Sequence, residues 1–318
     1  MRPWRSAVER FFLKYPYLMP MPRNDETILI LGASGWIGYN FTHQVCSTMP
    51  LARVIGTYFE HTTRQLPCQS LFFDYTVAAA LSSLLQSVRP SVVVNLLGGE
   101  EAGLFRTHQE LTRKLKELSV YYIFMSSSMV FDADVSKPHQ ETDPIQGKSS
   151  YGIHKEQCER FLHDEGENYC IMRISATHGY SPNKISRTER FLQNMQLGKS
   201  VHVDEKIFQN RLGVADLVSM IIQVMDARLQ GVIHLGTIDQ SEEVDFLRKI
   251  AKHYGYNPHK VEPVKSTPKY LTMIPKTIYE VFGEHLARTE ADTLEYIAKI
   301  PEFQKYKKAT RKSGGGDC

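Results

Sequence analysis

Cysteine is scarce and scattered in this chain of 318 residues. The five cysteines are odd in number and include no Cys-x-x-Cys pair: Cys46, Cys68, Cys158, Cys170 and Cys318. This spacing argues against a disulfide framework and against a zinc site. We therefore expect a reducing, cytoplasmic location and no bound metal.

Long apolar runs and a strong net charge are also missing. No run approaches the length that spans a bilayer, and residues 1–21 mix Arg, Glu and Lys with aromatics instead of forming the apolar core of a secretory signal. A net charge of +3 is too small to predict nucleic-acid binding. The basic residues near both ends are interpreted as solvated termini, so we expect neither membrane nor nucleic acid as a partner.

Short apolar runs alternate with helical patterns in the first 175 residues. The expected strands are residues 27–31, 53–57, 71–73, 92–96, 121–125 and 170–173. The expected helices are residues 36–46, 77–88, 105–118 and 152–163. Continuous apolar strands that alternate with helices predict right-handed crossovers and an α/β fold, the Rossmann type of doubly wound parallel sheet.

Prolines interrupt this alternation beyond Arg173. We expect a smaller C-terminal substrate-binding lobe there, from which residues 232–235 return one strand to the main sheet. The full expected division is an N-terminal arm (1–25), a dinucleotide-binding Rossmann domain (26–175), the substrate lobe (176–302) and a basic disordered tail (303–318).

Three glycines, Gly32, Gly35 and Gly38, follow the first expected strand and open a helix. Gly32 allows a sharp turn, Gly35 lets the backbone approach a pyrophosphate, and Gly38 lets the helix pack closely. The free N–H groups of the helix N-terminus would bind the phosphates. The turn predicts a dinucleotide site; the alternative is a tight turn without a ligand. The candidate cofactor-binding residues here are Gly32, Ser34, Gly35, Trp36, Ile37 and Gly38.

The end of the second strand bears on which cofactor is used. NAD sites usually carry an acidic residue there, but this chain has Thr57 and Tyr58, with Glu60 slightly beyond. We expect NADP more than NAD, with Tyr58 beside the cofactor and Arg64, or less readily Arg53, facing the 2′-phosphate. The alternative for Arg64 is a solvated loop residue.

Two later positions are further cofactor candidates. Asp74 follows the third strand, where it could hold the adenine amino group or act as the N-cap of the next helix. Leu97 and Gly98 follow the fourth strand, at the same end of the sheet as the glycine turn.

Tyr151 and Lys155 lie four residues apart, on one face of an expected helix. The ammonium should lower the phenol pKa, so that Tyr151 can exchange the proton that accompanies hydride transfer; Lys155 would also hold the nicotinamide ribose. One of the serines 126–128, which end the fifth strand, would hydrogen-bond the substrate oxygen. The alternative is a surface Tyr and Lys with no role.

Together these residues resemble the extended short-chain dehydrogenase/reductase family, in particular its dehydrorhamnose reductases and sugar epimerases. The resemblance covers about residues 27–255. Aligning Val130 and Phe131 on the family's Val-aromatic pair implies that the catalytic hydroxyl belongs to Ser127. It further implies a homodimer and three substrate-binding residues, Ser128, His178 and Arg211. The alternative for Arg211 is a structural role.

Two departures from the family pattern concern Asn95 and His108. Asn95 is followed by Leu-Leu-Gly-Gly where the family has Asn-x-Ala-Ala, and His108 stands where many members carry a helical Asn. The Thr-Asp-Glu set of sugar dehydratases is absent, which disfavours dehydration.

The expected function is an NAD(P)-dependent oxidoreductase that reduces a keto group on a nucleotide-sugar-like small molecule, with Tyr151 as acid/base. One alternative is a nucleotide-sugar epimerase that keeps its cofactor bound. Another is a non-catalytic NAD(P)-binding regulatory subunit, which His108 and the changed loop after Asn95 leave open.

Overall fold

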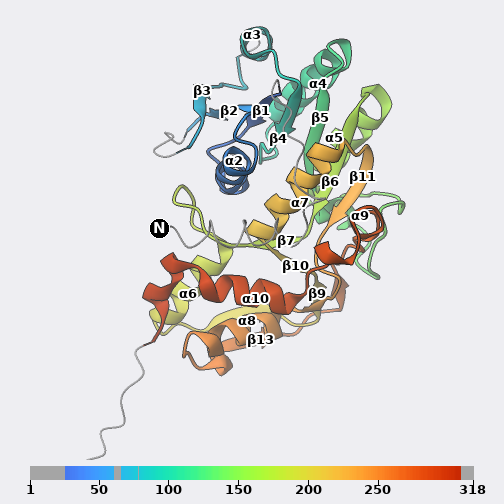
Figure 1. Ribbon diagram of the computed structural model, residues 1–318. Helices are drawn as coiled ribbons and strands as arrows, with labels where there is room; N and C mark the ends of the chain where they lie inside the picture. Colours follow the sequence, from blue (N-terminus) through green and yellow to red (C-terminus); the bar gives the residue numbers. More distant parts are fainter. Residues whose placement is uncertain (1–25, 61–65, 78, 309–318) are drawn as a thin grey trace, which may run out of the picture.

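A parallel sheet of seven strands forms the centre of the protein (Figure 1). The computed structural model describes residues 26–60, 66–77 and 79–308. The strand order is β11-β6-β5-β4-β1-β2-β3, and all neighbours are parallel. The strands are β1 (Thr27–Leu31), β2 (Arg53–Tyr58), β3 (Gln69–Phe72), β4 (Val92–Asn95), β5 (Tyr121–Ser127), β6 (Tyr169–Ile174) and β11 (Gly231–Leu235). The predicted α/β fold is confirmed, and β11 pairs with β6 at one edge of this sheet.

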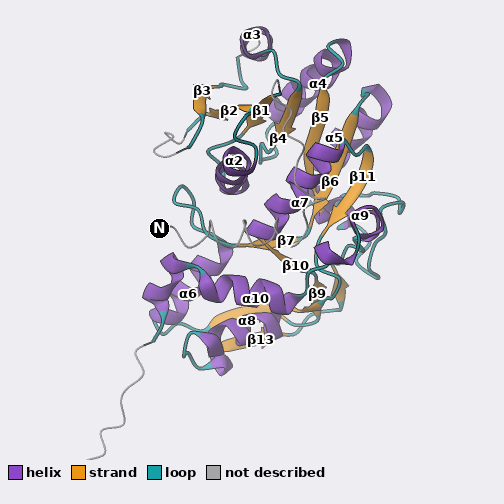
Figure 2. Cartoon of the chain, in the orientation of Figure 1, coloured by secondary structure: helices purple, strands orange, loops and turns teal. Residues whose placement is uncertain are grey.

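Helices cover both faces of this sheet (Figure 2). One face carries α2 (Trp36–Thr48) and α7 (Val214–Ala227), and the other carries α3 (Ala80–Val88), α4 (Ala102–Glu117) and α5 (Ser150–Glu165). Successive residues of a strand point to opposite faces, so Ile28 and Ile30 of β1 pack in the first layer, whereas Leu29 and Leu31 pack in the second.

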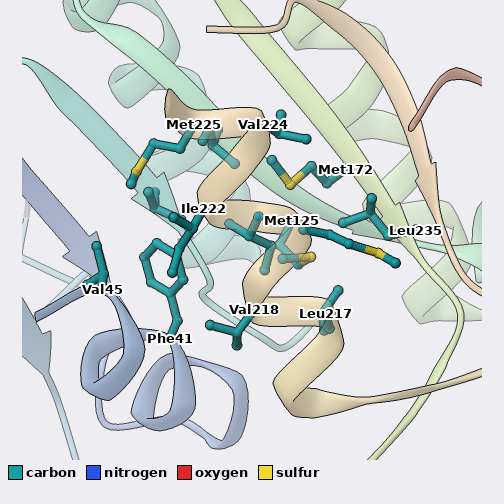
Figure 3. Close-up of a cluster of buried hydrophobic side chains, with 14 of the residues drawn as sticks. Phe41, Val45, Met125, Met172, Leu217, Val218, Ile222, Val224, Met225 and Leu235 are labelled. Carbon is teal, nitrogen blue, oxygen red and sulfur yellow. The ribbon is translucent and has the colours of Figure 1, made fainter. Parts of the chain in front are cut away.

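Helix α7 comes from the second half of the chain but completes the core of the first. Figure 3 shows its residues Leu217 and Ile222 among Phe41 of α2, Met125 of β5 and Met172 of β6. All five side chains are at most 5% exposed. One face of the seven-stranded sheet is therefore closed by a helix that lies beyond residue 175 in the sequence.

The other elements of the second half form a separate layer below the sheet in Figure 1. Its helices are α6 (Arg187–Gln196), α8 (Glu243–His253) and α10 (Glu290–Lys299); α9 (Lys276–Phe282) lies beside β11. Short strands pair as β10 (Arg211–Gly213) with β7 (Ala176–His178), β13 (Val261–Val264) with β8 (Val201–Asp204), and β9 (Ile207–Gln209) with β12 (Ser241–Glu242) and β14 (Lys269–Tyr270). The described part of the chain also contains the 3-10 helices η2 (Ser128–Phe131), η3 (Pro258–Lys260), η4 (Glu284–Leu286) and η5 (Pro301–Tyr306).

Helix η5 extends into the segment where the tail was expected to begin. Its residues Phe303 and Tyr306 are buried in an apolar cluster with Phe246 and Ile297 of the second lobe. Two buried aromatic side chains hold this segment on the lobe, so the folded chain continues beyond residue 303. The N-terminal arm and residues 309–318 lie outside the described residues.

Helix α3 begins at Ala80, three residues later than expected. Its N-cap is Ala79, and the Asp74 carboxylate instead accepts hydrogen bonds from the backbone and hydroxyl of Thr76, at 2.8 and 2.6 Å. A short polar side chain commonly closes such a turn on its own backbone. The prediction that Asp74 caps the helix is therefore wrong.

Candidate active site

The glycine turn after β1 has the geometry that close packing requires. Gly32 has a φ of +80°, and a Cβ atom on Gly38 would lie 2.1 Å from the Gly32 carbonyl oxygen, so neither position accepts a larger residue without strain or displacement. The turn is closed by hydrogen bonds from Gly35 N to Gly32 O, at 3.0 Å, and from Gly32 N to the Thr57 hydroxyl, also at 3.0 Å. Thr57 thus supports the turn from β2.

The N-terminus of α2 is open to an anion. Its N-cap is Gly35, no side chain of the described residues caps it, and its first turn carries no acidic residue. The first N–H groups of a helix need acceptors, and phosphate oxygens satisfy them well. Ser34 is buried beside this end, whereas Trp36 and Ile37 pack partly against the core.

A cleft runs from this turn along the carboxyl ends of β1, β2 and β4. It is lined by Gly32, Ser34, Gly35, Thr57, Tyr58, Phe59, Glu60, Phe73, Tyr75, Leu96, Leu97, Gly98, Glu101 and Leu104. The lining includes six of the thirteen predicted cofactor-binding residues: Gly32, Ser34, Gly35, Tyr58, Leu97 and Gly98. The described residues of the set that do not line this cleft are Trp36, Ile37, Gly38, Asp74, Tyr151 and Lys155, and the Asp74 carboxylate is bonded to Thr76.

One end of the cleft is aromatic, which sequence reasoning missed. The ring centroids of Phe59 and Tyr75 lie 5.2 Å apart, and Glu60 adds a carboxylate beside them. The signal was present as an aromatic residue after each of the second and third strands. The predicted 2′-phosphate partner, Arg64, lies outside the described residues.

The three serines at the end of β5 have different surroundings. Ser126 is buried and donates a hydrogen bond to Glu159 of α5, which forms a 2.7 Å ion pair with Arg173 of β6. Ser127 accepts from the backbone N–H of Met129, at 3.2 Å, as the N-cap of η2. The Ser126 side chain thus belongs to a structural hydrogen-bond network. Ser127 is the last residue of β5, and Ser128 follows it.

Tyr151 and Lys155 lie on α5, whose N-cap Ser149 accepts from the N–H of Gly152 at 3.0 Å. The Ser127 side chain lies close enough to the Tyr151 hydroxyl to lower the pKa of Tyr151. Lys155 is buried, and its Nζ donates to the Met125 carbonyl at 3.0 Å. The predicted Ser, Tyr and Lys therefore come together at the carboxyl end of β5.

The expected effect of Lys155 on Tyr151 is wrong. Burial raises the pKa of Tyr151, and the nearby Ser127 side chain offsets only part of the rise. The Lys155 Nζ lies 5.9 Å from the centroid of the Tyr151 ring, and burial lowers the pKa of Lys155 to about 8. The phenol is therefore held in its protonated form at neutral pH.

His178 and Arg211, predicted to bind substrate, are both buried. The His178 Nδ1 lies 2.9 Å from the hydroxyl of Thr188. The Arg211 guanidinium forms ion pairs with Glu243, at 2.7 Å, and Glu290, at 3.4 Å, and its side chain has no exposed surface. For Arg211 the structural alternative holds, because two carboxylates from later elements already satisfy its charge.

These residues fit a dinucleotide. The glycine turn leaves room that a Cβ would fill, the α2 N-terminus has free donors, and the aromatic end suits a base. Within the described residues, Lys155 makes one hydrogen bond to protein, which leaves donors on its ammonium for ribose hydroxyls. Over the described parts of the chain, no group of three His, Cys, Asp or Glu residues could hold a metal ion, and no helix is long and apolar enough to cross a membrane.

Two curated proteins show what the sequence resembles. A dTDP-4-keto-6-deoxy-D-glucose reductase from Streptomyces niveus is 23% identical over 210 residues, covering 61% of this chain and 71% of that protein. The spore coat polysaccharide biosynthesis protein SpsK from Bacillus subtilis is 21% identical over 273 residues, covering 83% and 91% of the two chains.

Solved structures show the same fold at low sequence identity. A dTDP-glucose 4,6-dehydratase from Bacillus anthracis, in complex with NAD, has a TM-score of 0.73 at 18% identity and covers 89% of this chain and 100% of that one. A dTDP-4-dehydrorhamnose reductase from the same organism, in complex with NADP, has a TM-score of 0.70 at 18% identity, with coverages of 86% and 97%.

The family model described as the RmlD substrate binding domain matches residues 105–290, more than half of the chain. This match spans the predicted Ser-Tyr-Lys set and most of the second lobe. The resemblance to the nucleotide-sugar branch of the extended short-chain dehydrogenase/reductases is confirmed, and the chain belongs to the RmlD substrate binding domain family.

Proposed function

We propose that this protein is an NAD(P)-dependent reductase that reduces a keto group on a nucleotide-sugar-like substrate. The observation that carries the proposal is the gathering of Ser127, Tyr151 and Lys155 at the carboxyl end of β5, where the Lys155 Nζ donates to the Met125 carbonyl at 3.0 Å and lies 5.9 Å from the centroid of the Tyr151 ring. The name of the Streptomyces niveus relative, a keto-sugar reductase, supports the substrate class.

Tyr151 is the proposed proton donor. The carbonyl oxygen of the substrate takes the phenolic proton while its carbon takes a hydride, so that the C=O group becomes a secondary alcohol. A bound reduced nicotinamide would supply the hydride. Ser127 would donate a hydrogen bond to the same oxygen as negative charge develops there. Because burial raises the pKa of Tyr151, the phenol stays protonated at neutral pH, which is the state that a reductase needs.

Lys155 is proposed to hold the cofactor. Its ammonium is charged below a pH of about 8, and its spare N–H groups would hold the nicotinamide ribose. The N-terminus of α2 and the turn at Gly32 and Gly35 would hold the pyrophosphate, with Leu97 and Gly98 opposite and the aromatic end of the cleft around the adenine.

We propose NADP as the preferred cofactor, with a modest preference over NAD. Arg64 would pair with a 2′-phosphate, whereas the Glu60 carboxylate in the cleft would repel it and accept from ribose hydroxyls instead. The similar reductase from Bacillus anthracis is in complex with NADP. The test is to denature the purified protein and identify the released dinucleotide. Release of NADP would mean that the charge of Arg64 decides the preference, and release of NAD would mean that the charge of Glu60 does.

We propose that residues 176–302 form the substrate lobe, except for α7 and β11, which pack on the main sheet. The support is a direct link between the lobe and the glycine turn. The Asn183 amide donates to the Ser34 carbonyl at 3.1 Å, and the Asn40 amide donates to the Tyr180 carbonyl at 3.0 Å. A substrate held by this lobe would therefore lie against the cofactor cleft.

Replacing Tyr151 by Phe tests the function. With dTDP-4-keto-6-deoxyglucose and NADPH, Tyr151→Phe should lower kcat by at least about a hundredfold, because the acid is lost, and should leave the dinucleotide Kd within about twofold. Tyr256→Phe, at another Tyr-x-x-x-Lys pair, should keep wild-type turnover. Net consumption of NADPH distinguishes a reductase from an epimerase. A Tyr151→Phe protein that reduces keto sugars at the wild-type rate would disprove the proposed role.

A further inference from the structure

A chain of buried hydrogen bonds runs beneath the candidate site. The Leu97 N–H donates to Asn95 Oδ1 at 3.1 Å, and the Asn95 amide donates to the Tyr122 hydroxyl at 2.9 Å. That hydroxyl lies 3.1 Å from His108 Nδ1, and His108 Nε2 lies 2.9 Å from the Cys158 carbonyl. Asn95, Tyr122 and His108 are each at most 4% exposed.

Only one direction of donation satisfies every atom of this chain. The Cys158 carbonyl can only accept, so His108 Nε2 carries a hydrogen, and Nδ1 of the neutral ring can only accept. The Tyr122 hydroxyl must then donate to Nδ1, which leaves its oxygen to accept from Asn95. A neutral imidazole is consistent with burial, which lowers the pKa of His108 to about 3.

The chain joins two parts of the candidate site that are far apart in the sequence. Leu97 lines the cofactor cleft after β4, and Cys158 lies on α5 three residues after Lys155. The His108 ring also packs on the Phe124 ring, at 4.6 Å between centroids, and the Lys155 ammonium lies 4.7 Å from the centroid of that ring. The neutral ring of His108 thus lies close to the catalytic lysine without repelling it.

We propose that Asn95, Tyr122 and His108 are positioning residues that fix the cofactor-binding loop at Leu97 relative to the helix carrying Tyr151 and Lys155. None of the three touches the reacting atoms. The expected effect on turnover rests on the proposed function. The neutral state of His108 and the direction of donation along the hydrogen-bond chain do not rest on it.

Two neighbouring tyrosines provide a matched comparison. Tyr122→Phe removes the central hydroxyl of the chain, whereas Tyr121→Phe removes the hydroxyl of a residue with similarly low exposure, which donates to the Leu229 carbonyl on the other face of the sheet. Both variants should lose similar stability. Tyr122→Phe alone should raise the NADPH Kd about tenfold, the effect of losing one or two buried hydrogen bonds, and lower kcat by a similar factor.

The Kd and kcat of Tyr121→Phe should stay within about twofold of wild type. Equal changes in both variants, or no change in either, would overturn the positioning role. His108→Gln, which keeps one donor and one acceptor, should retain more affinity and turnover than His108→Leu, which keeps neither; equal losses would also refute the proposal.

Nitrogen NMR of the labelled wild-type protein tests the direction of the chain without any turnover. The His108 ring should show the neutral Nε2–H form at pH 7 and should keep it at pH 6, below the ordinary histidine pKa. A charged ring, or a neutral ring with its hydrogen on Nδ1, would overturn the inference. If this spectrum and the Kd difference hold but no keto sugar is reduced, then the proposed function fails and the positioning of the cofactor loop stands.

Discussion

Lys155 is a cation that the fold buries at a cost. Burial lowers its pKa from 10.5 to about 8, so charging this side chain at pH 7 costs about 3 kcal/mol more in the folded protein than in the unfolded chain. We predict that Lys155→Met abolishes turnover but leaves the protein as stable as wild type, or up to about 3 kcal/mol more stable, because Met fills similar space without a charge.

Urea unfolding at several pH values checks this prediction and its sign. Between pH 8 and pH 10.5 the unfolded chain holds a proton that the folded Lys155 has lost, so wild-type stability should rise with pH over this range. The advantage of Lys155→Met should therefore shrink toward pH 10.5. A variant clearly less stable than wild type at pH 7 would show that the lysine stabilises the fold.

The sequence predicted that the proposed catalytic residues lie together better than it predicted the contacts of the residues around them. Ser127 ends β5, Tyr151 lies in the first turn of α5 and Lys155 lies one turn later, and the element order alone brings them together. Arg211 was harder to interpret, because its partners Glu243 and Glu290 are 32 and 79 residues away in the chain. Neither spacing nor periodicity reports such distant ion pairs.

Among the elements, the turn between β1 and α2 tolerates the least change. A methyl group on Gly38 would meet the Gly32 carbonyl oxygen at 2.1 Å and the Ala33 Cα at 2.8 Å, both backbone atoms. We predict that Gly38→Ala displaces α2, costs about 3 kcal/mol of stability and abolishes dinucleotide binding, measured by thermal unfolding and by titration with NADPH.

Gly98 is the stability control for this substitution. It lies on the same cleft, yet a Cβ there would have no atom within 4 Å. Gly98→Ala should therefore unfold within about 2 °C of wild type, in line with the small effect of most changes that disturb no packing. Equal destabilisation by both substitutions would mean that close packing at residue 38 is unimportant.

Strands were easier to predict than helix starts. β1 and β4 are short apolar runs buried on both faces, a pattern that needs no distant information. The start of α3 depended on which atoms the Asp74 carboxylate would bind. Asp74 accepts hydrogen bonds from Thr76 instead of capping the helix. A side chain that could cap a helix can also form such a local hydrogen bond, and the sequence does not show which of the two it forms.

Across the whole molecule, buried neutral histidines should make the fold sensitive to acid. Burial lowers the pKa of His108, His178 and His234 to about 3 each. Below pH 6.5 these histidines take up protons in the unfolded chain but not in the folded protein, so the free energy of unfolding falls as the pH falls. At pH 5 each histidine should cost about 2 kcal/mol, and the sum approaches the total stability of a typical domain.

Unfolding free energies measured from pH 7.5 to pH 5 test this expectation. The slope near pH 5 should correspond to about three protons taken up on unfolding. His108→Gln should reduce that number by about one. A stability that does not change between pH 7 and pH 5 would show that these imidazoles are protonated in the folded protein.

At this scale the fold class was predictable, because alternating strands and helices leave few alternatives to a parallel sheet. The small sheets of the second lobe were not. β8 pairs with β13, and β7 pairs with β10, across long stretches of chain. Short partly polar strands carry little periodicity from which such pairings could be predicted.

The position of α7 has a consequence for synthesis on the ribosome. The first six strands of the sheet end at Ile174, but α7 and β11, which close one face and one edge of it, end only at Leu235. At ordinary rates of translation these last elements follow several seconds later. Until then Phe41, Val45 and Met172 face water or a chaperone, and the nascent chain is most prone to aggregation during this interval.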